Sequence, residues 1–128
     1  MRHLASNLYW LPAAGWAGTL FWMSHRPAGP GIPPWFLAHD KITHALAFGI
    51  LALLVYLALR RAHRAPIGLA AALAWLAATV YGGTDEIHQM FVPTRQPDWH
   101  DWLADTIGAA LAVALAAVAS RRRASRQT

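Results

Sequence analysis

Four long apolar segments alternate with short polar stretches along the chain, over residues 8–23, 42–59, 67–83 and 103–119. A helix of about 17 residues, rising ~1.5 Å per residue, reaches ~26 Å and so nearly crosses a ~30 Å hydrocarbon core. Residues 51–59 and 69–80 are apolar on every helical face rather than along one stripe, and a small soluble core cannot hide four such helices. The pattern predicts an all-α integral membrane protein, a bundle of four transmembrane helices.

The composition agrees with this prediction. The chain has 128 residues, of which 56% are hydrophobic and 13% are charged, whereas an average soluble domain carries about 25% charged residues. We expect one domain over residues 1–128. The absence of cysteine excludes disulfides, thiolate catalysis and cysteine-based metal sites.

The first apolar segment follows Met1-Arg2-His3, so a secretory signal peptide is an alternative to a retained helix. No convincing small-x-small cleavage site precedes the next loop, and Trp10, Trp16 and Trp22 suit a helix anchored at the membrane interface. We therefore count this segment as the first span. The proline-rich residues 27–34 that follow are expected to form an extended connector.

The basic residues predict the orientation in the membrane. Eight arginines lie in three places, which are the start of the chain, the link between the second and third segments, and a tail over residues 120–128: Arg2, Arg60, Arg61, Arg64, Arg121, Arg122, Arg123 and Arg126. An even number of spans puts these places on one side, and the other side has only Arg26, Lys41 and Arg95. The positive-inside rule then predicts that both termini lie in the cytoplasm. The arginine-rich tail is therefore a topology signal, and we expect no nucleic-acid partner.

The outer side carries every acidic residue of the chain, close to three helix ends: Asp40, Asp85, Glu86, Asp98, Asp101 and Asp105. Asp40 and His44 are four residues apart and share a helical face, although Asp40 also suits the role of a helix cap. Glu86 and Gln89 share one face of the third helix, while Asp85 and His88 share an adjacent one, and we expect only one of these faces to point inward.

The fourth helix opens with a single stripe of carboxylates, Asp98, Asp101 and Asp105, and Gly108 continues it. A glycine at that depth lets another helix approach closely, as small residues do in membrane bundles. Residues 91–98 contain two prolines and are expected to form a loop or re-entrant turn.

As a set, these residues resemble the VanZ-like family of small bacterial membrane proteins. The resemblance rests on Asp40-Lys41-x-x-His44-x-x-x-Phe48, on Glu86-x-x-Gln89-x-Phe91-x-Pro93-x-Arg95, and on Asp101 followed by Asp105 and Gly108. It implies an envelope-associated protein of the bacterial inner (plasma) membrane with four or five helices, with lipid head-group chemistry inferred from the polar residues. The family is named for an accessory teicoplanin-resistance protein, which suggests a link to glycopeptide resistance. Many members have Asn where Asp105 stands here.

The first functional hypothesis is an enzyme that modifies or hydrolyses the head group of a membrane lipid or lipid-linked precursor. The catalytic candidates are His44, Glu86, Asp40 and Asp101, with His44 as the general base and Glu86 as its rival. The candidates for substrate binding are Lys41, Gln89, Arg95 and Asp105, of which the two cations can hold a phosphate. No serine or cysteine lies in this set, which favours direct attack by water or by a substrate hydroxyl.

A divalent metal is possible as a cofactor, because His44, Glu86, Asp101 and Asp105 offer ligands for magnesium, manganese or zinc. No HExxH-type spacing is present to specify one.

Other interpretations use the same residues. A non-catalytic protein could bind a lipid-linked saccharide or a lipophilic glycopeptide in the polar cup, with Trp35, Trp99 and Trp102 stacking on sugar rings or anchoring the helices. Proton or ion passage is less favoured, because the inner halves of the helices carry no ionisable residue. A purely structural reading has Lys41 and Arg95 pairing with the acids to tie three helices together.

Overall fold

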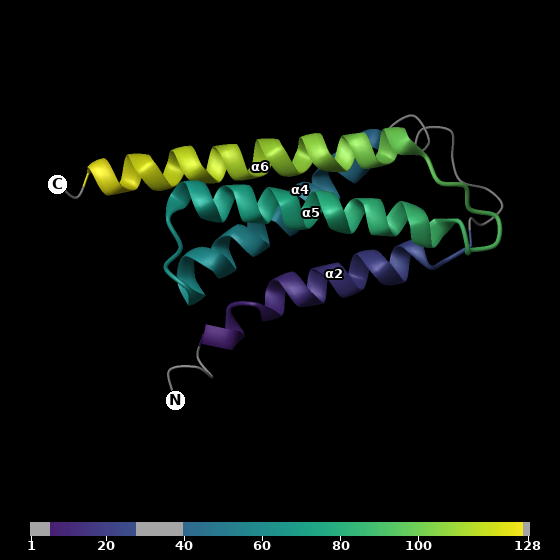
Figure 1. The fold of residues 1–128 in the computed structure, drawn as a ribbon, viewed down its shortest axis with the longest axis horizontal. Helices are drawn as coiled ribbons and strands as arrows, with labels where there is room; N and C mark the ends of the chain where they lie inside the picture. The colour runs from purple at the N-terminus through teal and green to yellow at the C-terminus, as the bar shows by residue number, and fades with distance from the viewer. Residues whose placement is uncertain (1–5, 28–39, 127–128) are drawn as a thin grey trace.

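The computed structural model describes residues 6–27 and 40–126, and this part of the chain is all-α. It contains the helices α2 (Leu11–Ser24), α4 (Asp40–Ala62), α5 (Ile67–Gln89) and α6 (Trp99–Ser125), and successive helices run in opposite directions (Figure 1). The predicted all-α class with four helices is confirmed for this part of the chain, and three of the four helices are candidate membrane spans. The connector predicted over residues 27–34 lies almost wholly outside the described residues, as does Trp35.

Helices α4, α5 and α6 are long and apolar enough to cross a membrane, with 23, 23 and 27 residues. Helix α2 has 14 residues and begins at Leu11 rather than at the predicted residue 8. Pro12 explains the later start, because it has no backbone N–H to donate to the preceding turn. A turn in which Trp10 N–H donates to Asn7 O at 3.0 Å joins α2 to the helical residues 6–8.

The other three helices extend beyond their predicted ends because polar residues continue them. Asp40 lies in the first turn of α4, and its last turn contains Arg60 and Arg61, charges that suit the two ends of the helix dipole. Helix α6 starts earlier than residue 103 because Asp98 caps it, accepting the His100 N–H at 2.9 Å. The arginine-rich tail predicted from residue 120 begins as part of α6, which continues to Ser125, because arginine is a good helix former.

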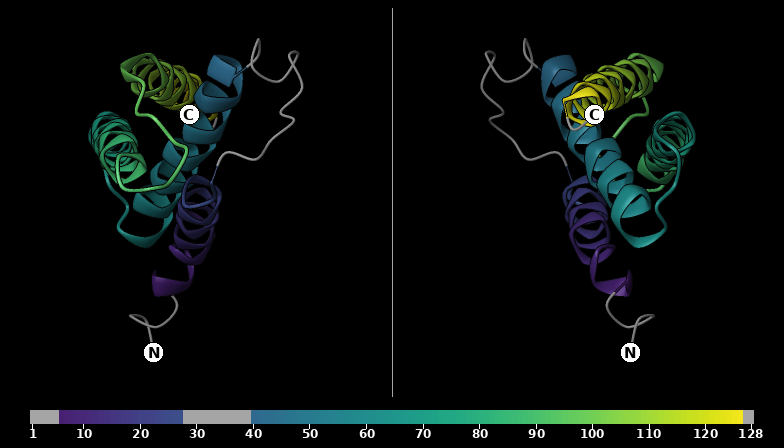
Figure 2. Two further views of the ribbon diagram at one scale, coloured as in Figure 1. Left: turned by 90° about the vertical axis from the view of Figure 1, so that its right-hand side faces the viewer. Right: turned by 90° about the vertical axis from the view of Figure 1, so that its left-hand side faces the viewer.

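Helix α4 crosses the bundle obliquely between α2 and α6, as the end-on views show (Figure 2). Small residues fill the contacts, and Ala52, Ala70, Ala74, Ala78 and Ala109 are fully buried. The tightest approach is at Gly108 of α6, where an added Cβ would overlap the backbone of Ala45 in α4. The predicted close approach at Gly108 is confirmed.

Aromatic side chains bind the helices to one another through backbone carbonyls. Trp16 Nε1 of α2 donates to Ala47 O at 2.9 Å, and Tyr81 Oη of α5 donates to Ala17 O at 2.7 Å. Trp102 Nε1 of α6 donates to Thr79 O at 2.9 Å. These bonds satisfy polar groups that would otherwise lack partners in lipid and fix α2 and α6 against the central helices.

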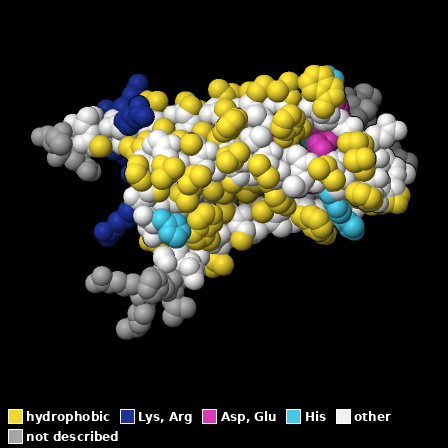
Figure 3. Space-filling view, viewed as in Figure 1, with side chains coloured by type: hydrophobic (Ala, Val, Ile, Leu, Met, Phe, Trp, Pro, Cys, Tyr) yellow, Lys and Arg dark blue, Asp and Glu magenta, His cyan; other side chains and the backbone are white. Residues whose placement is uncertain are grey.

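The charged side chains are separated along the bundle. Arginines gather at the end where α4 and α6 finish, and acidic side chains lie near the opposite end, with an apolar flank between them (Figure 3). We call these the basic end and the acidic end. The acidic end comprises the start of α4, the end of α5 and the start of α6, as the sequence predicts.

The Gly108 contact generates a stability prediction. Gly108→Ala places a methyl group into the Ala45 backbone, and relieving such overlap typically costs ~1 to 3 kcal/mol. We expect the midpoint of thermal unfolding in detergent to fall by several degrees. Gly18→Ala is the matched control, because nothing lies within 4 Å of its added Cβ, and it should leave the midpoint unchanged or raise it. Equal midpoints for the two variants would contradict the close contact.

Candidate functional site

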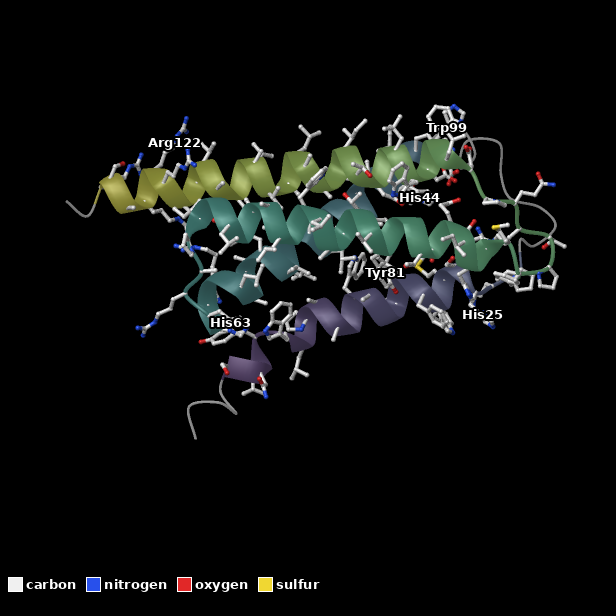
Figure 4. All side chains as sticks on the ribbon, viewed as in Figure 1. His25, His44, His63, Tyr81, Trp99 and Arg122 are labelled. Atoms are coloured by element: carbon white, nitrogen blue, oxygen red, sulfur yellow. The ribbon has the colours of Figure 1, made fainter. Side chains whose placement is uncertain are left out.

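His44 lies at the centre of a group of carboxylates at the acidic end (Figure 4). Its Nδ1 is 2.9 Å from Asp105 Oδ1, and the Asp105 side chain is only 1% exposed. On the other side of the ring, Nε2 is 3.7 Å from Asp101 Oδ2 and 4.0 Å from Asp40 Oδ1. The carboxylate that orients His44 therefore comes from α6, and Asp105, which the sequence suggested for substrate binding, holds the imidazole.

Glu86 joins this group from α5. Its Oε2 accepts the backbone N–H of Asp98 at 2.7 Å, which links the end of α5 to the start of α6. Its Oε1 is buried without a hydrogen-bond partner among the described residues, and so is Asp105 Oδ2. Asp105 Oδ2 lies against Gly82, where an added Cβ would be 2.8 Å away. The absence of a side chain at Gly82 thus leaves room for this carboxylate.

We define the polar centre as His44, Glu86, Asp101 and Asp105, with Asp40 at its edge. Two overlapping groups within it, Asp40–His44–Asp101 and His44–Glu86–Asp105, each bring three ligand atoms within 4.8 Å of one another. Both groups contain one imidazole and two carboxylates, which is a chemically reasonable ligand set for a divalent ion.

The expectation that only one face of α5 points inward is wrong. Asp85, Glu86 and Gln89 are all buried, because α5 packs on two sides. Gln89 Nε2 donates to Ser24 Oγ of α2 at 3.3 Å and to Asp85 Oδ2 at 3.2 Å, while Glu86 faces α6. His88 lies between these faces and the exterior, with its Nε2 3.1 Å from His25 Nδ1.

Lys41 forms ion pairs with acidic residues at the start of α6. Its Nζ pairs with Asp98 at 2.7 Å and with Asp101 at still closer range, and Asp40 lies 3.8 Å away. The pKa of Asp98 is held well below its ordinary value by the hydrogen bond from Lys41, assisted by the backbone N–H of His100. Lys41 therefore ties α4 to α6, as in the structural interpretation.

Arg95 has a different environment. Its Nε donates to Arg26 O at 3.0 Å and its Nη2 to Met23 O at 3.4 Å, at the end of α2. No carboxylate pairs with it within residues 6–27 and 40–126. Because a guanidinium has five N–H donors, Arg95 keeps donors and its full charge for a further anionic group.

A cavity of about 160 Å³ lies among α2, α4 and α5 beside His44. Its polar lining consists of Ser24, Asp40, Thr43, His44, Asp85, Gln89 and Arg95, and its apolar lining of Leu20, Met23, Ala47 and Phe48. Glu86, Asp101 and Asp105 do not line it and lie on the α6 side of His44. The predicted site residues thus form two connected parts, one facing the cavity and one supporting His44.

Sequence reasoning assigned no site role to three residues of this region. Asp85 and Asp98 are among the clustered acids, and the four-residue spacing of Asp85 to Gln89 and the place of Asp98 ahead of a helix, where caps occur, could have given each a role. Ser24 gave no signal, because its partner Gln89 is 65 positions away.

The lowered pKa of Asp98 predicts a pH effect on stability. A carboxyl whose pKa falls on folding stabilises the folded state above its ordinary pKa, and that stabilisation is lost as the pH falls toward the folded pKa. Asp98→Asn keeps a capping side chain but removes the charge that Lys41 faces. We expect the variant to unfold at a slightly lower temperature than the unchanged protein at neutral pH, with a gap that narrows below about pH 4. Thermal unfolding midpoints measured across this range test it, and a gap that does not change with pH would contradict the charge pairing.

The chain was compared with known proteins. The family model described as VanZ/LLP1 matches residues 6–120, which include α2, α4 and α5, most of α6 and every residue of the polar centre. No curated protein and no solved structure matches the chain. Because the family match extends over most of the sequence, the chain belongs to the VanZ/LLP1 family.

Proposed function

We propose that this protein is a membrane enzyme that modifies or hydrolyses the head group of a lipid or lipid-linked precursor at the acidic end of the bundle. The observation that carries the proposal is the pairing of His44 with the buried Asp105 at 2.9 Å, beside a cavity that His44 also lines. A carboxylate in this position fixes the orientation and tautomer of a histidine that activates a nucleophile. His44 is accordingly the place where an attacking water or hydroxyl loses its proton.

The cavity supports a head group as the substrate. Its volume of about 160 Å³ is below the ~300 to 1,000 Å³ of typical small-molecule sites, so it fits a compact polar group and not a whole lipid. Arg95 on one wall carries a charge that no acid neutralises among the described residues, which suits a phosphate. Leu20 and Phe48 provide an apolar side where a lipid attached to that phosphate is tolerated.

The proposed location is the bacterial inner membrane, with the acidic end outward and both termini in the cytoplasm. The segregation of arginines to the opposite end supports this orientation through the positive-inside rule. A change in the outer head groups would alter the surface that a glycopeptide antibiotic meets, which connects the proposal to resistance.

The orientation predicts how topology reporters behave. After Thr128, only the reporter that works in the cytoplasm should be active, because arginines are retained on the cytoplasmic side. Between Pro27 and Pro34, only the reporter that works outside the cytoplasm should be active. Paired cytoplasmic and periplasmic reporters at each position measure this. The reverse pattern would place the acidic end inside and overturn an outer-leaflet substrate.

The enzymatic role predicts the effect of conservative changes at the polar centre. Proton transfer typically contributes ~10²- to 10⁴-fold to a rate, so His44→Gln and Glu86→Gln should abolish head-group turnover while the protein still binds lipid. The measurement is mass analysis of lipid head groups from cells that express each variant or carry an empty vector. His88→Gln is the matched control, because this histidine lies at the same end outside the polar centre, and it should retain activity.

A binding protein of the same shape gives a different result. There, Arg95→Ala should be the most damaging change, since a charged contact to phosphate is lost, and His44→Gln should weaken binding by ~1 to 3 kcal/mol at most. If the unchanged protein alters no head group while it still binds a lipid, recognition replaces catalysis as its function.

A further inference from the structure

Three side chains from three helices converge on one point in the polar centre. His44 of α4, Glu86 of α5 and Asp105 of α6 each offer a ligand atom, and these atoms lie within 4.8 Å of one another. We propose that this group, named here the His-Glu-Asp site, binds a divalent transition-metal ion of the Zn²⁺ or Mn²⁺ kind.

The strongest support is the pair of carboxylate oxygens that have no partner. Glu86 Oε1 and Asp105 Oδ2 are buried and accept no hydrogen bond within the described part of the chain. Glu86 is 8% exposed and Asp105 is fully buried, so bulk water does not readily solvate either group. Buried polar groups are almost always satisfied in native proteins. A bound ion supplies the missing partner for both oxygens at once.

The balance of charge leads to the same inference. Lys41 is engaged by Asp98 and Asp101, and Arg95 by backbone carbonyls. Among the described residues, neither lysine nor arginine pairs with Glu86 or Asp105. Two carboxylates this close in a membrane bundle need compensation, and a dication offsets both charges whereas a protonated His44 offsets one at most.

The geometry is compatible with one ion. Ligand atoms that share an ion through bonds of ~2.1 Å lie roughly 3 to 3.5 Å apart, and the candidate atoms of His44, Glu86 and Asp105 lie within 4.8 Å of one another with no ion to draw them together. The backbone N–H of Asp98 holds Glu86 through Oε2, which resembles the outer hydrogen bonds that orient metal-binding carboxylates. One imidazole nitrogen with two carboxylates favours zinc or manganese over calcium, which prefers oxygen ligands alone.

The neighbouring group Asp40–His44–Asp101 is a weaker candidate. Asp101 already pairs with Lys41 at short range, so an ion would have to displace an ammonium group. Neither Asp40 nor Asp101 has a buried oxygen without a partner. Both groups contain His44, so variants of their other members distinguish between them.

Only the catalytic role of the ion rests on the proposed function. In that setting, His44 would hold the ion through an unprotonated nitrogen, and the ion would supply the activation of water that the proposed function otherwise assigns to the imidazole. Ion binding itself needs no substrate and can be measured on the isolated protein.

The experiment uses the full chain purified in detergent, stripped with a chelator and then titrated with ZnCl₂ or MnCl₂. We expect about one ion per chain by elemental mass analysis, and an unfolding temperature that rises with ion concentration because the ion binds the folded state. Glu86→Gln and Asp105→Asn should each weaken binding by at least ~100-fold, the upper range for disturbing even the outer shell of a metal site.

Two control variants locate the site. His88→Gln and Asp40→Asn should bind the ion as the unchanged protein does. Loss of binding in His88→Gln would assign the ion to the exposed His25–His88 pair, and loss in Asp40→Asn would assign it to the neighbouring group, and either result overturns the proposal. An unchanged protein that binds neither ion overturns it whether or not the variants fold. A protein that binds the ion through this site but alters no lipid overturns only the proposed enzymatic function.

Discussion

The contact between Gly108 and the backbone of Ala45 sets the distance between α4 and α6, and the polar centre depends on that distance. His44 is next to Ala45 in α4, and Asp105 lies about one turn before Gly108 in α6. Any side chain at position 108 would push the helices apart, and the 2.9 Å contact between His44 and Asp105 would lengthen with them. The close packing of α4 and α6 at Gly108 therefore also assembles the site.

Charge compensation divides the acidic end into two parts with different properties. Lys41 pairs with both Asp98 and Asp101 and so fastens the start of α6 to α4. Glu86 and Asp105 have no such cation among the described residues, and each keeps a buried oxygen without a partner. The first part is a structural tie whose interactions are complete. The second is incomplete by itself, which is the property expected where a protein binds something else.

The sequence predicted the larger features because they follow from local patterns. Uninterrupted apolar runs define the long helices, and Gly108 stands on a stripe that marks a close contact. The partner of His44 could not be chosen in the same way. Asp40 is its neighbour by spacing, but Asp105 becomes its partner only through the rotation of α6 against α4. The burial of Asp85 likewise depends on α2 and α6 packing on two sides of α5, and no periodicity within α5 encodes that arrangement.

The position of the cavity constrains what a substrate of the proposed enzyme must look like. The cavity opens among α2, α4 and α5, while Glu86 and Asp105 lie on the α6 side of His44. His44 is thus the only residue shared by the cavity and the His-Glu-Asp site, and a reacting group has to reach it from the side of Arg95. Since about 160 Å³ leaves no room for acyl chains, these stay in the bilayer. Discrimination between lipids must then arise from the head group and its charge. Arg95 attracts a negatively charged group, whereas the surrounding carboxylates repel one.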